Sequence, residues 1–112
     1  YWAERQAAKY LQEQGYEILE HNYRKPWGEI DVVAQKGGAL VFVEVKANQQ
    51  PVVGFEPELR ANTNKQRKVI RTARTYLTER KFPQAQEWQI DIISVTLQRS
   101  RGIATIRHFK NI

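Results

Sequence analysis

Two glycines near the middle of the chain constrain its fold more than any other feature. Gly37-Gly38 separates two segments, 29–34 and 40–46, in which apolar and polar residues alternate. This alternation predicts two β-strands, and a Gly-Gly pair between them predicts a two-residue hairpin turn. If the glycines are the two central turn residues, the register of the hairpin is determined completely.

That register places charged residues opposite one another. It gives three opposed pairs on one side of the hairpin: Val33–Phe42, Asp31–Glu44 and Glu29–Lys46. Two carboxylates about 5 Å apart repel each other, and a divalent cation between them would compensate. Carboxylate oxygens suit Mg²⁺ or Mn²⁺. We therefore expect Asp31 and Glu44 to be metal ligands, with the backbone carbonyl of Val45 as a third.

Two other readings of the hairpin remain open. An antiparallel sheet often has one solvated face, and Glu29–Lys46 could be an ordinary cross-strand ion pair. Alternatively, the Lys46 ammonium lies on the same face as the acids, where it could orient a water molecule or neutralise charge at a phosphate. Glu29 would then orient the metal ligands from behind or help to hold a second metal ion. Glu4 is another candidate, because it lies at the edge of the apolar stripe of a predicted helix.

The remaining chain is consistent with a single α/β domain over residues 1–112. Periodicity predicts helices at 2–14 and 63–80, strands at 16–23, 28–36, 39–48, 88–97 and 103–109, and a long polar loop at 47–62. The order is α-β-β-β-α-β-β. A strand–helix–strand connection from 39 to 97 should join parallel strands, so we expect a mixed central sheet flanked by helices.

Composition excludes several classes of protein. With no cysteine, neither disulfides nor thiolate metal sites are available. No apolar run approaches the length of a membrane span and nothing resembles a signal peptide, so we expect no membrane association and a cytoplasmic location. The chain also contains no methionine, and we expect a short N-terminal piece to be missing from it.

The positive charge is concentrated in one segment. Residues 60–81 contain eight basic residues and one acid, whereas the rest of the chain has ten basic and eleven acidic residues. Such a segment is typical of a surface that binds a polyanion, although a solvated helix face has the same composition. The candidate phosphate contacts are Lys65, Arg67, Lys68, Arg71 and Arg74. Lys65 differs from the others because it lies one helical turn from Val69, on the inward side of the helix.

Taken together, these motifs resemble the YraN family, bacterial predicted endonucleases of the PD-(D/E)XK superfamily. The resemblance runs from Glu4 to about Val95 and includes Gly28-Glu29-Ile30-Asp31, Phe42-Val43-Glu44-Val45-Lys46 and the Lys65 helix. It implies a restriction-endonuclease-like fold, similar to archaeal Holliday-junction resolvases. It also implies catalytic positions at Asp31, Glu44 and Lys46, with Glu4 as a helix acid near a Mg²⁺ or Mn²⁺ ion.

Three functions follow as hypotheses. The first is a metal-dependent endonuclease that hydrolyses DNA phosphodiester bonds, with branched or structured DNA as candidate substrate. Branched-DNA nucleases of this kind often act as homodimers, so a homodimer is a further expectation. The alternative is a non-catalytic nucleic-acid-binding module with the same fold. The third is a protein-interaction domain whose basic helix binds an acidic partner.

Three aromatic residues are assigned mainly structural roles. His21 and His108 are single histidines on predicted strands, with no partner set apparent in the sequence. Trp27 follows Pro26 in a predicted turn, where it could cap the core or stack on a base.

Overall fold

Gly37 and Gly38 form the predicted turn. Both have positive φ, 59° and 81°, as a turn of this type requires. The turn joins β2 (Gly28–Lys36) to β3 (Ala39–Asn48), and Val33 pairs with Phe42 as the register predicts. The computed structural model that provides these positions describes residues 2–48, 63–98 and 100–112.

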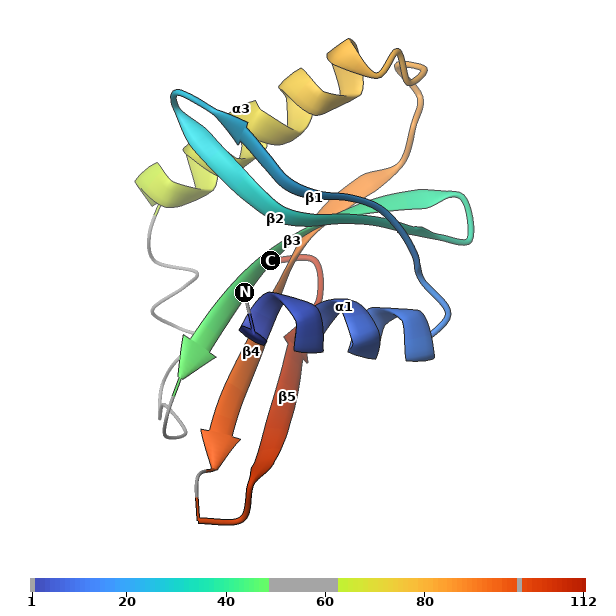
Figure 1. Cartoon of the computed structure of the whole chain (residues 1–112). Coiled ribbons are helices and arrows are strands. Elements are labelled where there is room, and N and C mark those ends of the chain that lie inside the picture. The colour runs from blue at the N-terminus through green and yellow to red at the C-terminus, as the bar shows by residue number, and fades with distance from the viewer. Residues whose placement is uncertain (1, 49–62, 99) are drawn as a thin grey trace.

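Five strands form one sheet in the order β1-β2-β3-β4-β5. The elements besides the hairpin are α1 (Trp2–Glu13), β1 (Glu17–Lys25), α3 (Thr63–Glu79), β4 (Trp88–Gln98) and β5 (Ile103–Phe109). All neighbouring strands are antiparallel except β3 and β4, which are parallel. The predicted α/β class, element order and mixed sheet are confirmed (Figure 1).

Most boundaries lie within one residue of the prediction, and the largest difference is at the end of β1. β1 continues through Lys25, which pairs with Gly28, so that only Pro26 and Trp27 form the turn. β3 covers Ala39–Asn48 as predicted, and Ala47, which the predicted loop 47–62 also included, pairs with Val95 of the parallel strand. The rest of that loop, 49–62, lies outside the described residues.

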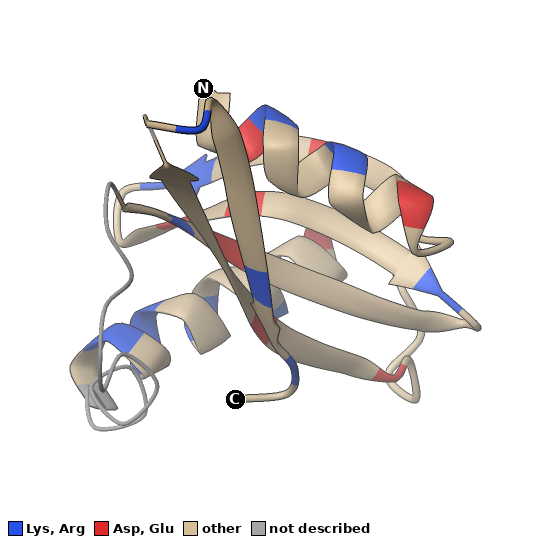
Figure 2. Ribbon diagram, turned by 90° about the horizontal axis from the view of Figure 1, so that it is seen from below, with Lys and Arg blue, Asp and Glu red and all other residues tan. Residues whose placement is uncertain are grey.

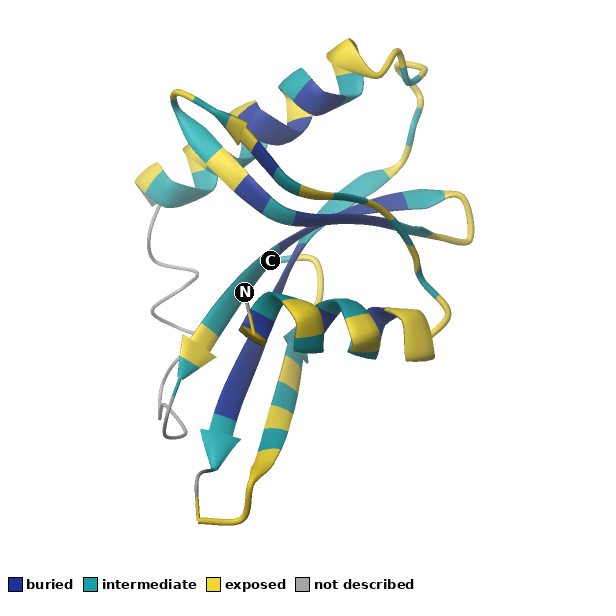
Figure 3. Cartoon of the chain, in the orientation of Figure 1, coloured by how far each residue is buried: buried dark blue, intermediate teal, exposed yellow. Residues whose placement is uncertain are grey.

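The two helices cover opposite faces of the sheet (Figure 1). Under α1, Ala7 and Leu11 pack in a cluster that includes Val32 of β2 and Val43 of β3. Under α3, the other cluster combines residues of β1, β2 and β3 with two from α3 itself: Tyr23, Ile30, Val33, Leu40, Phe42, Ala73 and Tyr76. The dark band of buried residues in Figure 3 lies in the strands between the helices.

The faces are not covered equally. α1 contacts all five strands, whereas α3 packs mainly on β2, with a smaller contact with β1. The α3 side of β4 is therefore left more open. Within the described part of the chain, neither helix is long and apolar enough to cross a membrane.

A close backbone approach brings β2 against α3. A Cβ placed on Gly28 would lie 2.6 Å from the Thr72 hydroxyl oxygen and 3.4 Å from the Lys68 carbonyl oxygen. No side chain larger than hydrogen fits there without movement. Gly28 therefore determines how closely the start of β2, which carries Glu29 and Asp31, lies to the basic helix.

Candidate functional site

Asp31 lies where β2 and β3 stop pairing. The paired residues run from Lys36–Ala39 up to Val32–Val43, and Asp31 is the next residue along β2. Its carboxylate accepts a hydrogen bond of 2.7 Å from the backbone N–H of Val45. A side chain thus takes the role of a backbone acceptor, which leaves this end of β2 free to diverge from β3.

The alternation of side chains also changes at this point. Ile30 packs in the cluster under α3, whereas Val32, two residues later, packs in the cluster under α1. Two residues on one regular strand would share a face. The irregularity at Asp31 lets its carboxylate reach both the α1 side and the α3 side of the sheet.

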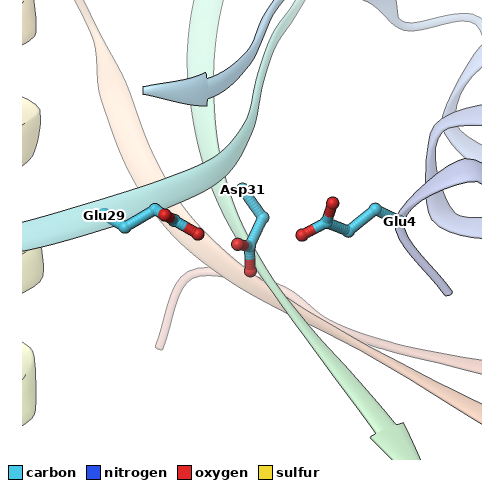
Figure 4. Close-up of side chains that lie close together, drawn as sticks. All are labelled: Glu4, Glu29 and Asp31. Atoms are coloured by element: carbon cyan, nitrogen blue, oxygen red, sulfur yellow. The ribbon is translucent and has the colours of Figure 1, made fainter. Parts of the chain in front are cut away.

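Three carboxylates meet here and form what we call the acidic group: Glu4, Glu29 and Asp31. One oxygen from each lies within 4.8 Å of the others. Figure 4 shows Asp31 between the other two, with Glu4 reaching in from α1 and Glu29 coming from the same strand as Asp31. Sequence reasoning gave Glu29 only a secondary role, because its approach to Glu4 depends on how α1 is placed on the sheet.

The environment of Asp31 favours its protonated form. Burial raises the pKa of this carboxyl to about 7, and the neighbouring Glu29 and Glu4 act in the same direction. The hydrogen bond from Val45 acts against this shift, since it stabilises the charged form. Like charges are therefore held together here at a cost that a bound cation would remove.

Glu44 is held by two lysines. Its Oε1 lies 2.9 Å from Lys46 Nζ and 2.6 Å from Lys65 Nζ. The Glu44 side chain is 19% exposed, less than either lysine. Lys65 points toward the sheet, as its place on the helix predicts, and its pKa is raised by Glu44 and the other groups of the site, which outweigh the opposing effect of burial.

The cross-strand pair predicted for Glu29 and Lys46 is wrong. Glu29 is instead paired with Arg24 of β1, its neighbour in the sheet register, and Lys46 is paired with Glu44. The physical reason is the loss of β2–β3 pairing beyond Val32, which moves Glu29 toward β1 and α1.

One cavity connects the acids with the basic helix. It has a volume of about 270 Å³, and the described residues lining it are Gly28, Glu29, Asp31, Glu44, Lys65, Lys68 and Val69. Glu4 is not among these lining residues: its carboxylate meets Glu29 and Asp31, and its side chain lines a separate surface hollow with His21. Lys46 does not line the cavity either, but its ammonium pairs with Glu44, which does.

The predicted phosphate contacts divide into two sets. Lys65 and Lys68 line the cavity with the acids. Arg67, Arg71 and Arg74 lie along an open groove of about 540 Å³ on the outer face of α3. Figure 2 shows the basic positions distributed along this helix.

Trp27 is part of this basic surface. Its ring lies under the guanidinium of Arg71, whose Cζ is 4.0 Å from the ring centroid. A cation over the face of an indole is favourable. The Trp27 Nε1 is buried and has no hydrogen-bond partner among the residues that the structure describes. The ring contact holds Arg71 next to Gly28, which lines the cavity.

His108 has partners that the sequence did not reveal. Its Nε2 lies 2.7 Å from the fully buried carboxylate of Asp91, and its Nδ1 lies 3.1 Å from the Tyr10 hydroxyl. The structural role predicted for His108 agrees with this burial, but the absence of partners was wrong. Tyr10 is 98 positions away, so only the tertiary fold brings the three together. His21 is exposed.

The residues present fit a hard divalent cation. The acidic group offers carboxylate oxygens, the ligands that Mg²⁺ and Mn²⁺ prefer. Glu44, the other predicted ligand, lines the same cavity as Asp31 but is not one of the three converging carboxylates, and it is paired with Lys46 and Lys65 instead. Val45, predicted to offer its carbonyl, is seen to use its N–H to hold Asp31 in place.

Comparison with known proteins gives the family. A model of the uncharacterised protein family UPF0102 matches residues 3–95. A UPF0102 protein of Lachnoclostridium phytofermentans is 43% identical over 89% of this chain and 84% of its own length. A UPF0102 protein of Syntrophotalea carbinolica is 41% identical over 96% of this chain and 85% of its own length. A UPF0102 protein of Thermotoga petrophila is 39% identical over 98% of this chain and 92% of its own length. This chain belongs to the UPF0102 family, also called the YraN family.

Proposed function

We propose that this protein is a divalent-metal-dependent endonuclease that hydrolyses phosphodiester bonds of DNA. The observation that carries the proposal is the convergence of Glu4, Glu29 and Asp31 beside the Glu44–Lys46 pair. Basic residues of helix α3 border the same cavity, and their positive charge would attract the phosphates of a nucleic acid.

Asp31 and Glu44 would hold the metal, with Glu4 and Glu29 close enough to share it or to orient its waters. A Mg²⁺ or Mn²⁺ ion bound to these oxygens would lower the pKa of a coordinated water and neutralise charge on the scissile phosphate. The raised pKa of Asp31 supports this assignment, because a carboxyl that is costly to ionise alone gains most from a cation.

The two lysines would act on the phosphate. Lys46 follows Glu44 by two residues on β3, so both side chains point the same way and their charged atoms meet. Once Glu44 is shared with a cation, the ammonium of Lys46 is placed to stabilise negative charge that develops on the phosphate oxygens. Lys65 reaches the same carboxylate from α3 and would add a second positive contact.

The test is cleavage of a panel of linear, flapped, branched and single-stranded DNAs with Mn²⁺. We expect Asp31→Ala and Glu44→Ala to abolish cleavage, and Lys46→Ala to reduce it by roughly 100-fold or more. Glu13→Ala is the matched control, since Glu13 is an exposed acid at the far end of α1. Circular dichroism checks that each variant is folded. Cleavage retained by both acid variants would rule out the proposal.

A specific observation favours a second candidate. Two ammonium groups contact the same oxygen, Oε1, of Glu44, an arrangement that would also suit a nucleic-acid-binding module without catalysis. Calorimetric titration with Mn²⁺ distinguishes the two. The nuclease binds the metal and loses roughly 10- to 100-fold in affinity on Glu44→Gln, whereas the binding module retains DNA without metal affinity.

A further inference from the structure

A second, more enclosed cavity adjoins the candidate metal site. We call it the aliphatic slot. Its volume is about 250 Å³, and the described residues lining it are Glu44, Lys65, Gln66, Val69, Ile70, Ile90, Ile92 and Ile112. Most of this surface is apolar, which sets the slot apart from the charged cavity beside it.

The slot has two facing walls. Val69 and Ile70 come from α3, and Ile90 and Ile92 come from β4. It exists because α3 packs mainly on β2 and stands away from β4. Ile112 closes one side, and its backbone N–H donates to the Ile90 carbonyl at 2.9 Å.

The slot is continuous with the acidic site. Glu44, Lys65 and Val69 line both cavities. A group held in the slot would therefore lie next to a phosphate placed at Glu44 and Lys65. The ion pair between these residues, 2.6 Å long, marks the boundary between the polar and the apolar space.

Three features identify the occupant. The volume of about 250 Å³ exceeds that of several water molecules, each of which takes about 30 Å³ of liquid, so the slot has room for a ring system. The flat apolar faces of such a ring suit aliphatic walls, and the Gln66 amide offers both a donor and an acceptor to a ring edge. The open end carries a lysine beside a site for phosphate, so the ring must be one that is linked to a phosphate.

We propose that the aliphatic slot binds one unstacked nucleobase of the DNA strand, next to the phosphate held at the acidic site. This inference rests on the proposed function and names the substrate class more closely. A base must leave its stack to enter the slot, which is easiest where DNA is mismatched, branched or single-stranded. The slot would thus favour structured DNA without reading a long sequence.

The experiment uses DNA that carries 2-aminopurine at successive single positions, because this base brightens when it unstacks. The full chain is mixed with each DNA in Ca²⁺, and cleavage is assayed separately in Mn²⁺. We expect a several-fold fluorescence rise at one position, adjacent to the cleaved bond, and little change at positions three or more nucleotides away.

Ile70→Phe fills the slot from the helix side, where Ile70 is only half-buried. It should remove most of the fluorescence rise and slow cleavage of duplex substrates by about tenfold or more. Ile103→Phe is the matched control, an identical change on β5 at a side chain that is 46% exposed. The control should behave as the unmodified protein does. Gln66→Leu provides a second variant that does not enlarge the side chain. It should alter which 2-aminopurine position gives the largest fluorescence rise.

The outcomes separate the two proposals. Cleavage by the unmodified protein with no brightening at any position overturns the slot and leaves the nuclease intact. Brightening that Ile70→Phe and Gln66→Leu both leave unchanged places the unstacked base elsewhere, and also overturns it. A protein that neither binds nor cuts any DNA overturns the proposed function itself.

Discussion

Asp31 illustrates how one residue can be costly to the fold and central to the site. Its carboxylate replaces a backbone acceptor for Val45, and it is packed against two other acids. Its pKa is raised from 3.8 to about 7, chiefly by burial. Functional sites often hold such groups in environments that disfavour their charge. The protein accepts this cost at the position where a cation would remove it.

The cost should be measurable as a dependence of stability on pH. Because the folded-state pKa is the higher one, the folded protein binds more protons than the unfolded chain between about pH 4 and 7. The free energy of unfolding should therefore fall as the pH rises through that range. Asp31→Asn removes the charge and keeps an acceptor for Val45. In chelator, it should stabilise the protein at pH 8 by about 2 kcal/mol, a value discounted for partial solvent screening.

Urea unfolding at pH 4 and pH 8 tests this. The gain from Asp31→Asn should almost vanish at pH 4, where Asp31 is protonated in the folded state. Glu13→Gln, an exposed acid on α1, should show no comparable difference between the two pH values. A gain of equal size at both would mean that charge at Asp31 is not the cause.

Gly28 tests the other residue-scale constraint. Gly28→Ala would place a Cβ 2.6 Å from the buried Thr72 hydroxyl oxygen. Overpacking of this kind costs about 1–3 kcal/mol of unfolding free energy. Thr72→Ala removes the oxygen, so the double variant should recover part of that loss. Thermal unfolding of the two single variants and the double variant measures the coupling, and strictly additive losses would contradict the contact.

At the scale of elements, the hairpin was predictable from local sequence and the site was only partly so. Gly37-Gly38 determined the register from Val32–Val43 to the turn. Beyond Val32 the predicted register no longer describes the structure, because the Asp31 side chain replaces the backbone pairing. No local sequence pattern signals this interruption. The inward position of Lys65 was readable from helical spacing, whereas its ion pair with Glu44 depends on how α3 lies over the sheet.

Helix α3 carries basic residues that line two different cavities. Lys65 and Lys68 line the acidic cavity, while Arg67 and Arg74 line the outer groove. A strand of DNA that reaches the cavity would pass along this helix. If the arginines contact phosphates, each should contribute about one unit to the slope of log affinity against log salt concentration.

The Arg67→Ala and Arg74→Ala double variant tests that contribution. Its slope for duplex DNA, measured by fluorescence anisotropy over a range of NaCl concentrations, should be smaller by about two. The Lys9→Ala and Arg101→Ala double variant removes the same charge from exposed positions on α1 and in the β4–β5 turn, and should leave the slope nearly unchanged. An equal change in both would indicate only a net-charge effect. Unchanged affinity in all variants would favour an acidic protein partner for the helix.

At the scale of the whole molecule, the acidic group depends on how helix α1 is packed across the sheet. Glu4 belongs to α1, and Asp31 and Glu29 belong to β2. α1 is fixed at its other end by Tyr10, whose hydroxyl meets His108 of β5, which in turn meets Asp91 of β4. Class, element order and sheet type followed from periodicity, but this connection could not, since its members are far apart in sequence.

Asp91 is the centre of that connection. It is fully buried and accepts hydrogen bonds from Gln89 Nε2 at 2.8 Å and from the Asn111 backbone N–H at 2.9 Å, besides its contact with His108. An imidazole that donates a hydrogen bond to Asp91 from Nε2 can accept a hydrogen bond from the Tyr10 hydroxyl at Nδ1. The carboxylate therefore holds β4, β5 and the C-terminal residues together, and through His108 it orients α1.

Asp91→Ala should lower the free energy of unfolding by about 3 kcal/mol, because it removes a fully buried carboxylate and leaves its three partly buried hydrogen bonds without their acceptor. Asp91→Asn should cost less, and Tyr10→Phe only about 1 kcal/mol. Because the two residues act through one ring, the Tyr10→Phe and Asp91→Asn double variant should differ from additivity by at least about 0.5 kcal/mol in urea unfolding. Additive losses would show that Tyr10 and Asp91 act separately.

Tyr10→Phe should also weaken Mn²⁺ binding in calorimetry, since the helix that carries Glu4 loses its anchor. The exposed Lys9→Ala, one residue away, should leave both measurements unchanged.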